Sequence, residues 1–246
     1  MIIKQLTGHS GATVNLVEKD NKIVVEKFGK GTDRNHAQML VLGHSAAQPT
    51  ILSYDNGHLV MEYVPSTDMK HYLINENRTQ LVHFIKSTYD TLSGIIYDQT
   101  KDYLPVYERR LSAAEWLPAS IGEIIALLPR YLPQTLYHGD FTMNNILYDY
   151  NNARFVLIDA MTTDLDSIHF DISKLRQDLD CGWFIRDSNL LLSNRLLTLS
   201  EELGSYCAYY NNNAMAILAL LRVWPYSSEL DKKWLADQID KLWKQR

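Results

Sequence analysis

The chain has 246 residues, of which 46% are hydrophobic and 22% are charged, and these proportions are typical of an ordered globular protein. Its length allows one compact unit or two small lobes that share a cleft. A net charge of -5 leaves no basic footprint of the kind that binds nucleic acid, so we expect no nucleic-acid partner.

No segment of the sequence predicts export or a membrane span. The N-terminus becomes polar after three residues, too early for a signal peptide. The longest apolar run, Ala214–Leu221, is about half as long as a bilayer span. Cys181 and Cys207 lie far apart and lack metal-site spacing, which favours free thiols in a reducing cytosol. We therefore expect a soluble cytoplasmic protein with no membrane partner.

The first 65 residues favour β-structure interrupted by one helix. Apolar and β-branched residues predict strands over residues 2–3, 14–17, 23–28 and 58–65, and Pro65 ends the last strand. A helix is predicted over residues 33–44.

From Asp68 onward the pattern becomes mainly helical. Apolar residues at spacings of three and four predict one long helix with the stripe Leu81, Leu92 and Ile96, together with Ile85 and Tyr89. Further helices are predicted over residues 111–128, from Asp171, over 214–224 and over 231–243, and a strand over 155–158.

A turn of small residues, Thr7–Thr13, lies between the first two predicted strands and contains Gly8, Ser10 and Gly11. Glycines let the main chain approach a ligand closely, so such a turn can offer backbone N–H groups to phosphates. Two glycines are equally common in an ordinary hairpin, and the turn alone does not decide between the two interpretations.

Three polar residues carry the clearest chemical signal. His138-Gly139-Asp140 is followed five positions later by Asn145, and the apolar strand after it ends at Asp159. In phosphoryl transfer, one carboxylate accepts the proton of the attacking hydroxyl, while an Asn and a second carboxylate hold the metal that neutralises the phosphates. Asp140, Asn145 and Asp159 match these roles. Each piece alone is also typical of a turn or a strand end.

The compound pattern resembles the H-G-D-x-x-x-x-N loop of the aminoglycoside phosphotransferase family, which includes choline-type kinases and is distantly related to protein kinases. The resemblance implies a two-lobed α+β protein-kinase-like fold. A small β-rich nucleotide-binding lobe would span residues 1–65, and a larger, mainly helical catalytic and substrate lobe would span residues 66–246.

The resemblance also implies roles for residues outside the loop. The family's strand lysine, which reaches the α- and β-phosphates, corresponds to Lys27; the alternative is an exposed edge-strand lysine. Main-chain groups near Glu62 and Val64 would form a hinge that binds adenine. Asp171 matches the aspartate that braces the catalytic loop, which His138 would also shape, although an aspartate near a helix start is often a simple cap.

One element of the family pattern is missing. The helix over residues 33–44 lacks the glutamate that pairs with the strand lysine, and alignment places Asn35 at that position, with His36 and Gln38 as neighbours. None of the three carries a fixed negative charge. We expect either that Lys27 is held by an amide or by Asp159, or that the lobe rearranges when nucleotide binds.

The segment DISKLRQDL, which starts at Asp171, resembles a bacterial branch of the family associated with capsule and surface-carbohydrate biosynthesis. Gln177-Asp178 departs from the small residues usual there. This resemblance favours a sugar or sugar-like acceptor.

The predicted activity is transfer of the γ-phosphate of ATP or GTP, with Mg²⁺, to a hydroxyl of a small molecule. Alternatives are a nucleotide-binding pseudokinase that acts as a regulatory scaffold, and a metal-dependent hydrolase built on His138, Asp140 and Asp159. An aminoglycoside acceptor also remains open, because polycations need an acidic site and acids recur after the loop at positions 164, 166, 171, 178 and 180.

Overall fold

A computed structural model describes residues 1–6, 12–186 and 190–245, and for residues 190 and 191 only the backbone. The small-residue turn with Gly8, Ser10 and Gly11 lies outside the described residues.

The N-terminal part is a five-stranded antiparallel sheet with strand order β1-β2-β3-β5-β4. Two of its hairpins turn at residues with positive φ, Asp20-Asn21 between β2 and β3 and Asn56-Gly57 between β4 and β5. Such turns match the twist of antiparallel strands. The strands are β1 Ile2–Leu6, β2 Ala12–Lys19, β3 Lys22–Gly29, β4 Ile51–Asp55 and β5 His58–Glu62.

Helix α1, Thr32–Leu42, follows β3 and contacts β3 and β5. Its buried face carries Asn35, Gln38, Met39 and Leu42, which recur at the spacing of one helical face. Two amides are therefore buried beside two apolar side chains. Buried amides need hydrogen-bond partners, so this face does more than fill the core.

The rest of the described chain is mainly helical, with five short strands in two small sheets. β9 pairs with β6 and β10, and β7 pairs with β8. The elements are β6 Ser66–Thr67, α2 Met69–Asn75, α3 Arg78–Ser93, β7 Ile96–Asp102, α4 Leu104–Ser112, α5 Ile121–Ile125, β8 Tyr131–Thr135, β9 Ile146–Asp149, β10 Arg154–Leu157, α6 Ile168–Leu179, α7 Leu190–Gly204, α8 Asn213–Leu221 and α9 Glu229–Lys244.

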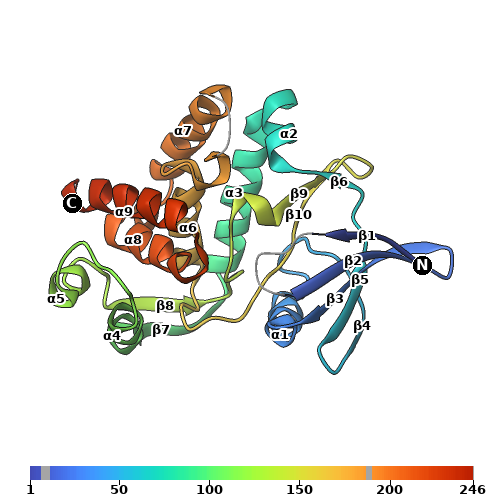
Figure 1. Ribbon diagram of the computed structural model, residues 1–246, viewed down its shortest axis with the longest axis horizontal. Helices are drawn as coiled ribbons and strands as arrows, with labels where there is room; N and C mark the ends of the chain where they lie inside the picture. The colour runs from blue at the N-terminus through green and yellow to red at the C-terminus, as the bar shows by residue number, and fades with distance from the viewer. Residues whose placement is uncertain (7–11, 187–189, 246) are drawn as a thin grey trace.

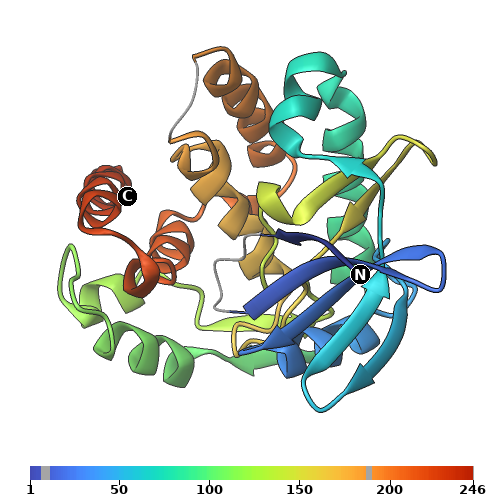
Figure 2. The same cartoon turned by 45° about the vertical axis from the view of Figure 1, so that its right-hand side comes forward.

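The sheet and helices α6 to α9 lie on opposite sides of the β9–β10 hairpin, as Figure 1 and Figure 2 both show. The two termini lie at opposite ends of the molecule (Figure 1). The expected mixed α+β arrangement is confirmed: a β-sheet N-terminal part precedes a helical C-terminal part. Among the helices that the structure describes, none is long and apolar enough to cross a membrane.

Helix α6 is buried along its whole length, although more than half of its side chains are polar or charged. It contacts α3, α7 and α8. Its N-cap is Ser167, whose side chain accepts a hydrogen bond from the backbone N–H of His169. Asp171 is therefore free of the capping role that the sequence left open. A buried helix with many polar side chains must give them partners inside the protein.

Two helix predictions are wrong in detail. The stripe that ends at Ile96 is not one helix, because α3 ends before Gly94 and Ile96 begins β7. The helix over residues 111–128 is instead the end of α4, a loop and the short α5. Pro118 lies in that loop, and a capping box between Ser120 and Glu123 starts a new helix.

Candidate active site

The loop around Asp140 depends on Gly139. Gly139 has φ 84°, and a Cβ there would lie 1.9 Å from the carbonyl oxygen of Met161. The backbone N–H of Met161 in turn donates to the carbonyl of His138 at 2.9 Å. Only glycine permits this approach, which fixes the Asp140 loop against the segment that follows Asp159.

Asp171 on α6 holds the same loop through its main chain. Its carboxylate accepts hydrogen bonds from the backbone N–H of His138 at 2.6 Å and from that of Gly139 at 3.0 Å. Burial raises the pKa of Asp171, and these backbone donors act against that rise. His138 is fully buried, and its burial lowers the pKa of the imidazole. A neutral His138 therefore packs beneath the loop.

The Asp140 carboxylate has two side-chain partners. Nδ2 of Asn145 donates to Oδ2 of Asp140 at 2.9 Å and to its backbone carbonyl at 2.8 Å. The ammonium of Lys174 forms an ion pair with Oδ1. Burial alone would raise the pKa of Asp140, but the charges of Lys174 and Arg222 outweigh burial and lower it to about 2. Asp140 is thus a carboxylate at neutral pH, with 29% of its side chain exposed.

Asn145 and Asp159 are brought together by the β9–β10 hairpin. The backbone N–H of Ile158 donates to the carbonyl of Asn145 at 3.0 Å, which places Asp159 beside the loop. Asp159 has φ 58°, a left-handed conformation that turns the chain directly after the strand. Its side chain is 44% exposed, so it is accessible to a ligand.

Lys27 pairs with Asp159. Its Nζ lies 2.8 Å from Oδ1 of Asp159, and its side chain is 4% exposed. This contact joins the sheet of the N-terminal part to the end of β10. Of the alternatives that the sequence left open for the missing glutamate, the structure has the pair with Asp159.

The three polar residues of α1 have other partners. Nδ2 of Asn35 donates to the carbonyl of Ala160 at 2.8 Å, and Nε2 of Gln38 donates to the carbonyl of Tyr137 at 2.5 Å. The ring of His36 stacks on Tyr54 at 3.8 Å between centroids. Asn35 therefore binds the main chain next to Asp159, and Gln38 binds the main chain just before the Asp140 loop. Helix α1 thus contacts both segments.

The expected hinge residues lie at the end of β5. The Glu62 carboxylate accepts hydrogen bonds from the hydroxyl of Thr50 at 2.9 Å and from its backbone N–H at 3.3 Å. Val64 is buried. The Glu62 side chain is thus bound to Thr50, the residue before β4. An adenine ring at this position would therefore contact main-chain groups.

Oxygen ligands suited to Mg²⁺ are available at the junction of the two loops. Asn145 uses its amide nitrogen toward Asp140, and Asp159 uses Oδ1 toward Lys27, so Oδ1 of Asn145 and Oδ2 of Asp159 are not engaged by these contacts. Mg²⁺ prefers such oxygens and is commonly held by one or two protein ligands plus substrate phosphates. Among the described residues, no group of three or more His, Cys, Asp or Glu side chains lies together as a metal site.

Sequence reasoning named Asp171 but missed Lys174 and Asp178, which lie on the same face of α6. Asp171, Lys174 and Asp178 lie at spacings of three and four and contact the catalytic loop in order: Asp171 contacts His138 and Gly139, Lys174 contacts Asp140, and Asp178 accepts from the backbone N–H of Met143 at 2.7 Å. The helical spacing from Asp171 to Lys174 was the available signal. Arg222, which donates to the carbonyl of Gly139 at 2.9 Å, comes from α8's end and had no local signal.

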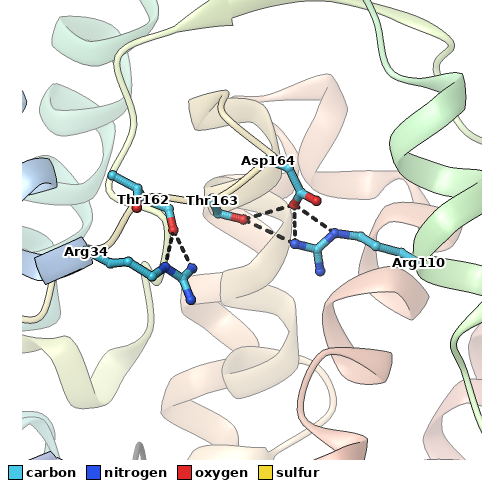
Figure 3. Close-up of a pocket in the computed structure, with 5 residues that line it drawn as sticks. All are labelled: Arg34, Arg110, Thr162, Thr163 and Asp164. Carbon is cyan, nitrogen blue, oxygen red and sulfur yellow. Dashed lines mark hydrogen bonds and ion pairs between the residues drawn. The ribbon is translucent and has the colours of Figure 1, made fainter. Parts of the chain in front are cut away.

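The acids after the loop do not form an acidic patch. Asp164 pairs with Arg109 and Arg110, and Asp166 accepts from Lys101, Tyr103 and Gln134. Asp180 pairs with Arg176 and accepts from Ser200. Figure 3 shows the Asp164 carboxylate turned toward Arg110. With Asp171 and Asp178 bound to main-chain N–H groups, all five acids have internal partners, so the reason for a polycation site is removed.

The fold and the arrangement of Asp140, Asn145, Asp159 and Lys27 are those of a small-molecule kinase. A model of the phosphotransferase enzyme family matches residues 47–186, and the chain belongs to that family. No curated protein matches the sequence.

Solved kinase structures share the fold at low sequence identity. Choline kinase LicA from Streptococcus pneumoniae superposes with a TM-score of 0.63 at 14% identity, over 99% of this chain and 93% of that chain. Aminoglycoside phosphotransferase APH(4)-Ia gives 0.63 at 12% identity, over 97% and 92%. An ethanolamine kinase from Plasmodium vivax gives 0.58 at 12% identity, over 97% and 81%.

Proposed function

We propose that this protein transfers the γ-phosphoryl group of Mg-bound ATP to a hydroxyl of a sugar or sugar-like small molecule. The observation that carries the proposal is the position of Asp140, an ionised carboxylate fixed by Asn145 and Lys174 at the edge of a cavity of about 500 Å³. The donor-side residues Lys27 and Asp159 meet next to the same loop.

Asp140 orients the acceptor hydroxyl and takes its proton. A bond forms between that oxygen and the γ-phosphorus while the bond to the β-phosphate oxygen breaks, and ADP leaves with the electron pair. Because the pKa of Asp140 is about 2, the carboxylate is a weak base in the resting protein. Orientation of the hydroxyl, with proton transfer late in the step, is therefore its main contribution.

Lys27, released from Asp159, steadies the α- and β-phosphates. Asn145 and Asp159 supply oxygens to Mg²⁺, which when bound neutralises charge on the transferring group. His138 and Asp171 keep the loop in shape through the buried contacts described above. In this proposal residues 1–65 form the nucleotide-binding lobe and residues 66–246 the catalytic and substrate lobe.

The remaining donor contacts follow the family pattern. From the resemblance we expect the segment with Gly8, Ser10 and Gly11, which lies outside the described residues, to offer main-chain N–H groups to the phosphates. The main chain near Glu62 and Val64 receives the adenine ring. A carbohydrate acceptor rests on the resemblance of DISKLRQDL to the capsule-associated branch.

Two aspartate substitutions test the division of roles. Asp140→Asn keeps the size of the side chain but removes the proton acceptor, so Mg-ATP affinity should change little while turnover falls by roughly 10²-fold or more. Asp159→Asn should weaken Mg-ATP binding itself. Calorimetry with Mg-ATP and an assay of ADP release against a panel of hydroxyl compounds, with GTP compared, measure both quantities.

Two experimental outcomes would contradict the proposal. Equal loss of nucleotide affinity in both variants would contradict the assigned roles. The absence of any Mg-dependent stabilisation of the protein by ATP, or a stabilisation that is undiminished in excess EDTA, would contradict the kinase activity or its metal ligands.

A further inference from the structure

The cavity beside Asp140 has walls of two kinds. It lies among the start of α1, helix α4, the end of α8 and the segment after Asp159. One part of the wall is apolar and includes Leu218, Leu221 and the exposed ring of Tyr226. The other part is charged, and its members are Lys30, Arg34, Arg110, Asp140, Lys174 and Arg222.

The charged wall is strongly cationic. Within the described part of the chain, it contains five basic side chains and a single carboxylate, Asp140. The whole chain carries a net charge of -5, so this concentration of positive charge runs against the composition of the protein. A concave surface lined by one sign of charge attracts ligands of the opposite sign.

Apart from Lys174, which pairs with Asp140, the cations of this wall are not each neutralised by a carboxylate of their own. The guanidinium of Arg34 binds the carbonyl of Thr162, and that of Arg222 binds the carbonyl of Gly139, and both partners are neutral. Lys30 is exposed to solvent. Arg110 shares Asp164 with Arg109, so two cations face one carboxylate. Figure 3 shows the guanidinium groups of Arg34 and Arg110 extended toward each other from opposite sides of the Thr162–Asp164 segment.

The position of the cavity assigns it to the acceptor rather than to the nucleotide. Its lining includes Asp140, the proposed proton acceptor. Lys27, Asn145 and Asp159, which face the nucleotide phosphates and Mg²⁺ in the proposed function, are not among the lining residues. A compound in this cavity can thus present a hydroxyl to Asp140 without contact with the residues assigned to the nucleotide.

We propose that the acceptor is an anion: a hydroxyl compound, sugar-like in its apolar face, that carries a phosphate or a carboxylate group. This inference rests on the proposed function and names its substrate class. The acid group binds between Arg34, Lys30 and Arg110, the body of the molecule packs on the apolar wall with Tyr226, and the hydroxyl faces Asp140. Polycationic antibiotics and quaternary amines would meet repulsion from the same side chains.

Binding of charged probes tests the inference without knowledge of the natural acceptor. Affinity for Mg-ADP is measured first, and the protein saturated with Mg-ADP is then titrated with glucose 6-phosphate, glucuronate, glucose and kanamycin. We expect at least one of the two anions to bind about 10-fold or more tightly than glucose, with an affinity that falls as salt rises, and no binding of kanamycin. The two anions distinguish a phosphate from a carboxylate ligand.

Paired variants separate the cavity from general charge effects. Lys30→Gln/Arg34→Gln should weaken binding of the anions by about 10-fold or more, and Lys30→Gln alone, an exposed change, should have a smaller effect of the same sign. Lys19→Gln/Lys22→Gln removes the same charge from the exposed turn between β2 and β3 and should leave binding unchanged.

Three results would overturn the inference: neither anion binds, kanamycin or glucose binds as tightly as the anions, or the two double variants weaken binding equally. Absence of Mg-ADP binding would instead contradict the proposed function. In that case the same titrations on the free protein still decide whether the cavity prefers anions.

Discussion

The ammonium of Lys174 forms an ion pair with the Asp140 carboxylate, and the two groups come from α6 and from the loop that precedes η1, Met143–Asn145. The lysine side chain is 8% exposed, so the pair is largely shielded from water. Burial lowers the pKa of Lys174, and the adjacent carboxylate opposes that effect. The cation both positions Asp140 and keeps it ionised.

Lys174→Met should therefore reduce turnover and change its pH dependence. Without the cation, the charge of Arg222 is left to oppose the effect of burial, so the pKa of Asp140 should rise from its value of about 2. The acid limb of kcat/KM should move to higher pH, so the variant should lose proportionally more activity at pH 5 than at pH 8. A pH profile of ADP release measures this, with the exposed Lys233→Met on α9 as the control. A uniform loss at all pH values would show that Lys174 does not set the ionisation of Asp140.

Gly139→Ala tests the contact between the two functional loops. The new Cβ would lie 1.9 Å from the Met161 carbonyl oxygen at a positive φ, so the loop must move. We expect turnover to fall by at least 10-fold and unfolding to occur at lower denaturant concentration. Gly122→Ala in α5 is the matched control, because no atom of the described residues lies within 4 Å of its Cβ, and it should be neutral or stabilise the protein by roughly 0.5–1 kcal/mol. Equal behaviour of the two variants would contradict the role of Gly139.

The proximity of Asp140, Asn145 and Asp159 could be predicted from the sequence because their pattern is local. Asp140 and Asn145 lie on one loop, and Asp159 follows the next predicted strand, so spacing alone was enough to group them. The Lys27–Asp159 pair joins residues 132 positions apart, and the Lys174–Asp140 pair joins residues 34 positions apart. No local pattern in the sequence specifies either pair. The partner of Asn35, the carbonyl of Ala160, lies 125 residues away and is likewise beyond any local pattern.

Secondary structure shows the same division. Strands β2, β3 and β5 followed from clustered β-branched residues, whereas β7 was read as helix because Ile96 continued the apolar spacing of α3. Gly94, after which the chain leaves the helix, was the stronger local signal. Pairing with β8 favours a strand at Ile96, although the apolar spacing of α3 favours a helix there.

The environment of Asn35 predicts that a glutamate at this position would destabilise the protein. Its amide donates to the Ala160 carbonyl inside the protein, and a carboxylate cannot donate that bond. Asn35→Glu should therefore destabilise the protein by about 1–3 kcal/mol through an unpaired buried carbonyl and should not raise nucleotide affinity. Ala37→Glu places the same charge on the exposed side of α1 and should have little effect. Denaturant unfolding and Mg-ATP calorimetry measure the two outcomes, and a rise in affinity for Asn35→Glu alone would contradict this assignment.

Asp178 makes stability depend on pH. Burial raises its pKa to about 7, against the opposing effects of the Met143 N–H and Lys174. In the unfolded chain the pKa is about 3.9, so between about pH 4 and 7 the folded state binds more protons and the free energy of unfolding falls as pH rises. Asp178→Asn keeps the oxygen that accepts from Met143 and does not titrate.

The variant should be more stable than the wild type above pH 7, by at most about 4 kcal/mol, which is the free energy that corresponds to this difference in pKa between the folded and unfolded states. The difference in stability should vanish near pH 4. Denaturant unfolding at pH 4, 5.5 and 8 measures it, and a difference that is the same at all three would show that Asp178 is ionised in the folded protein throughout.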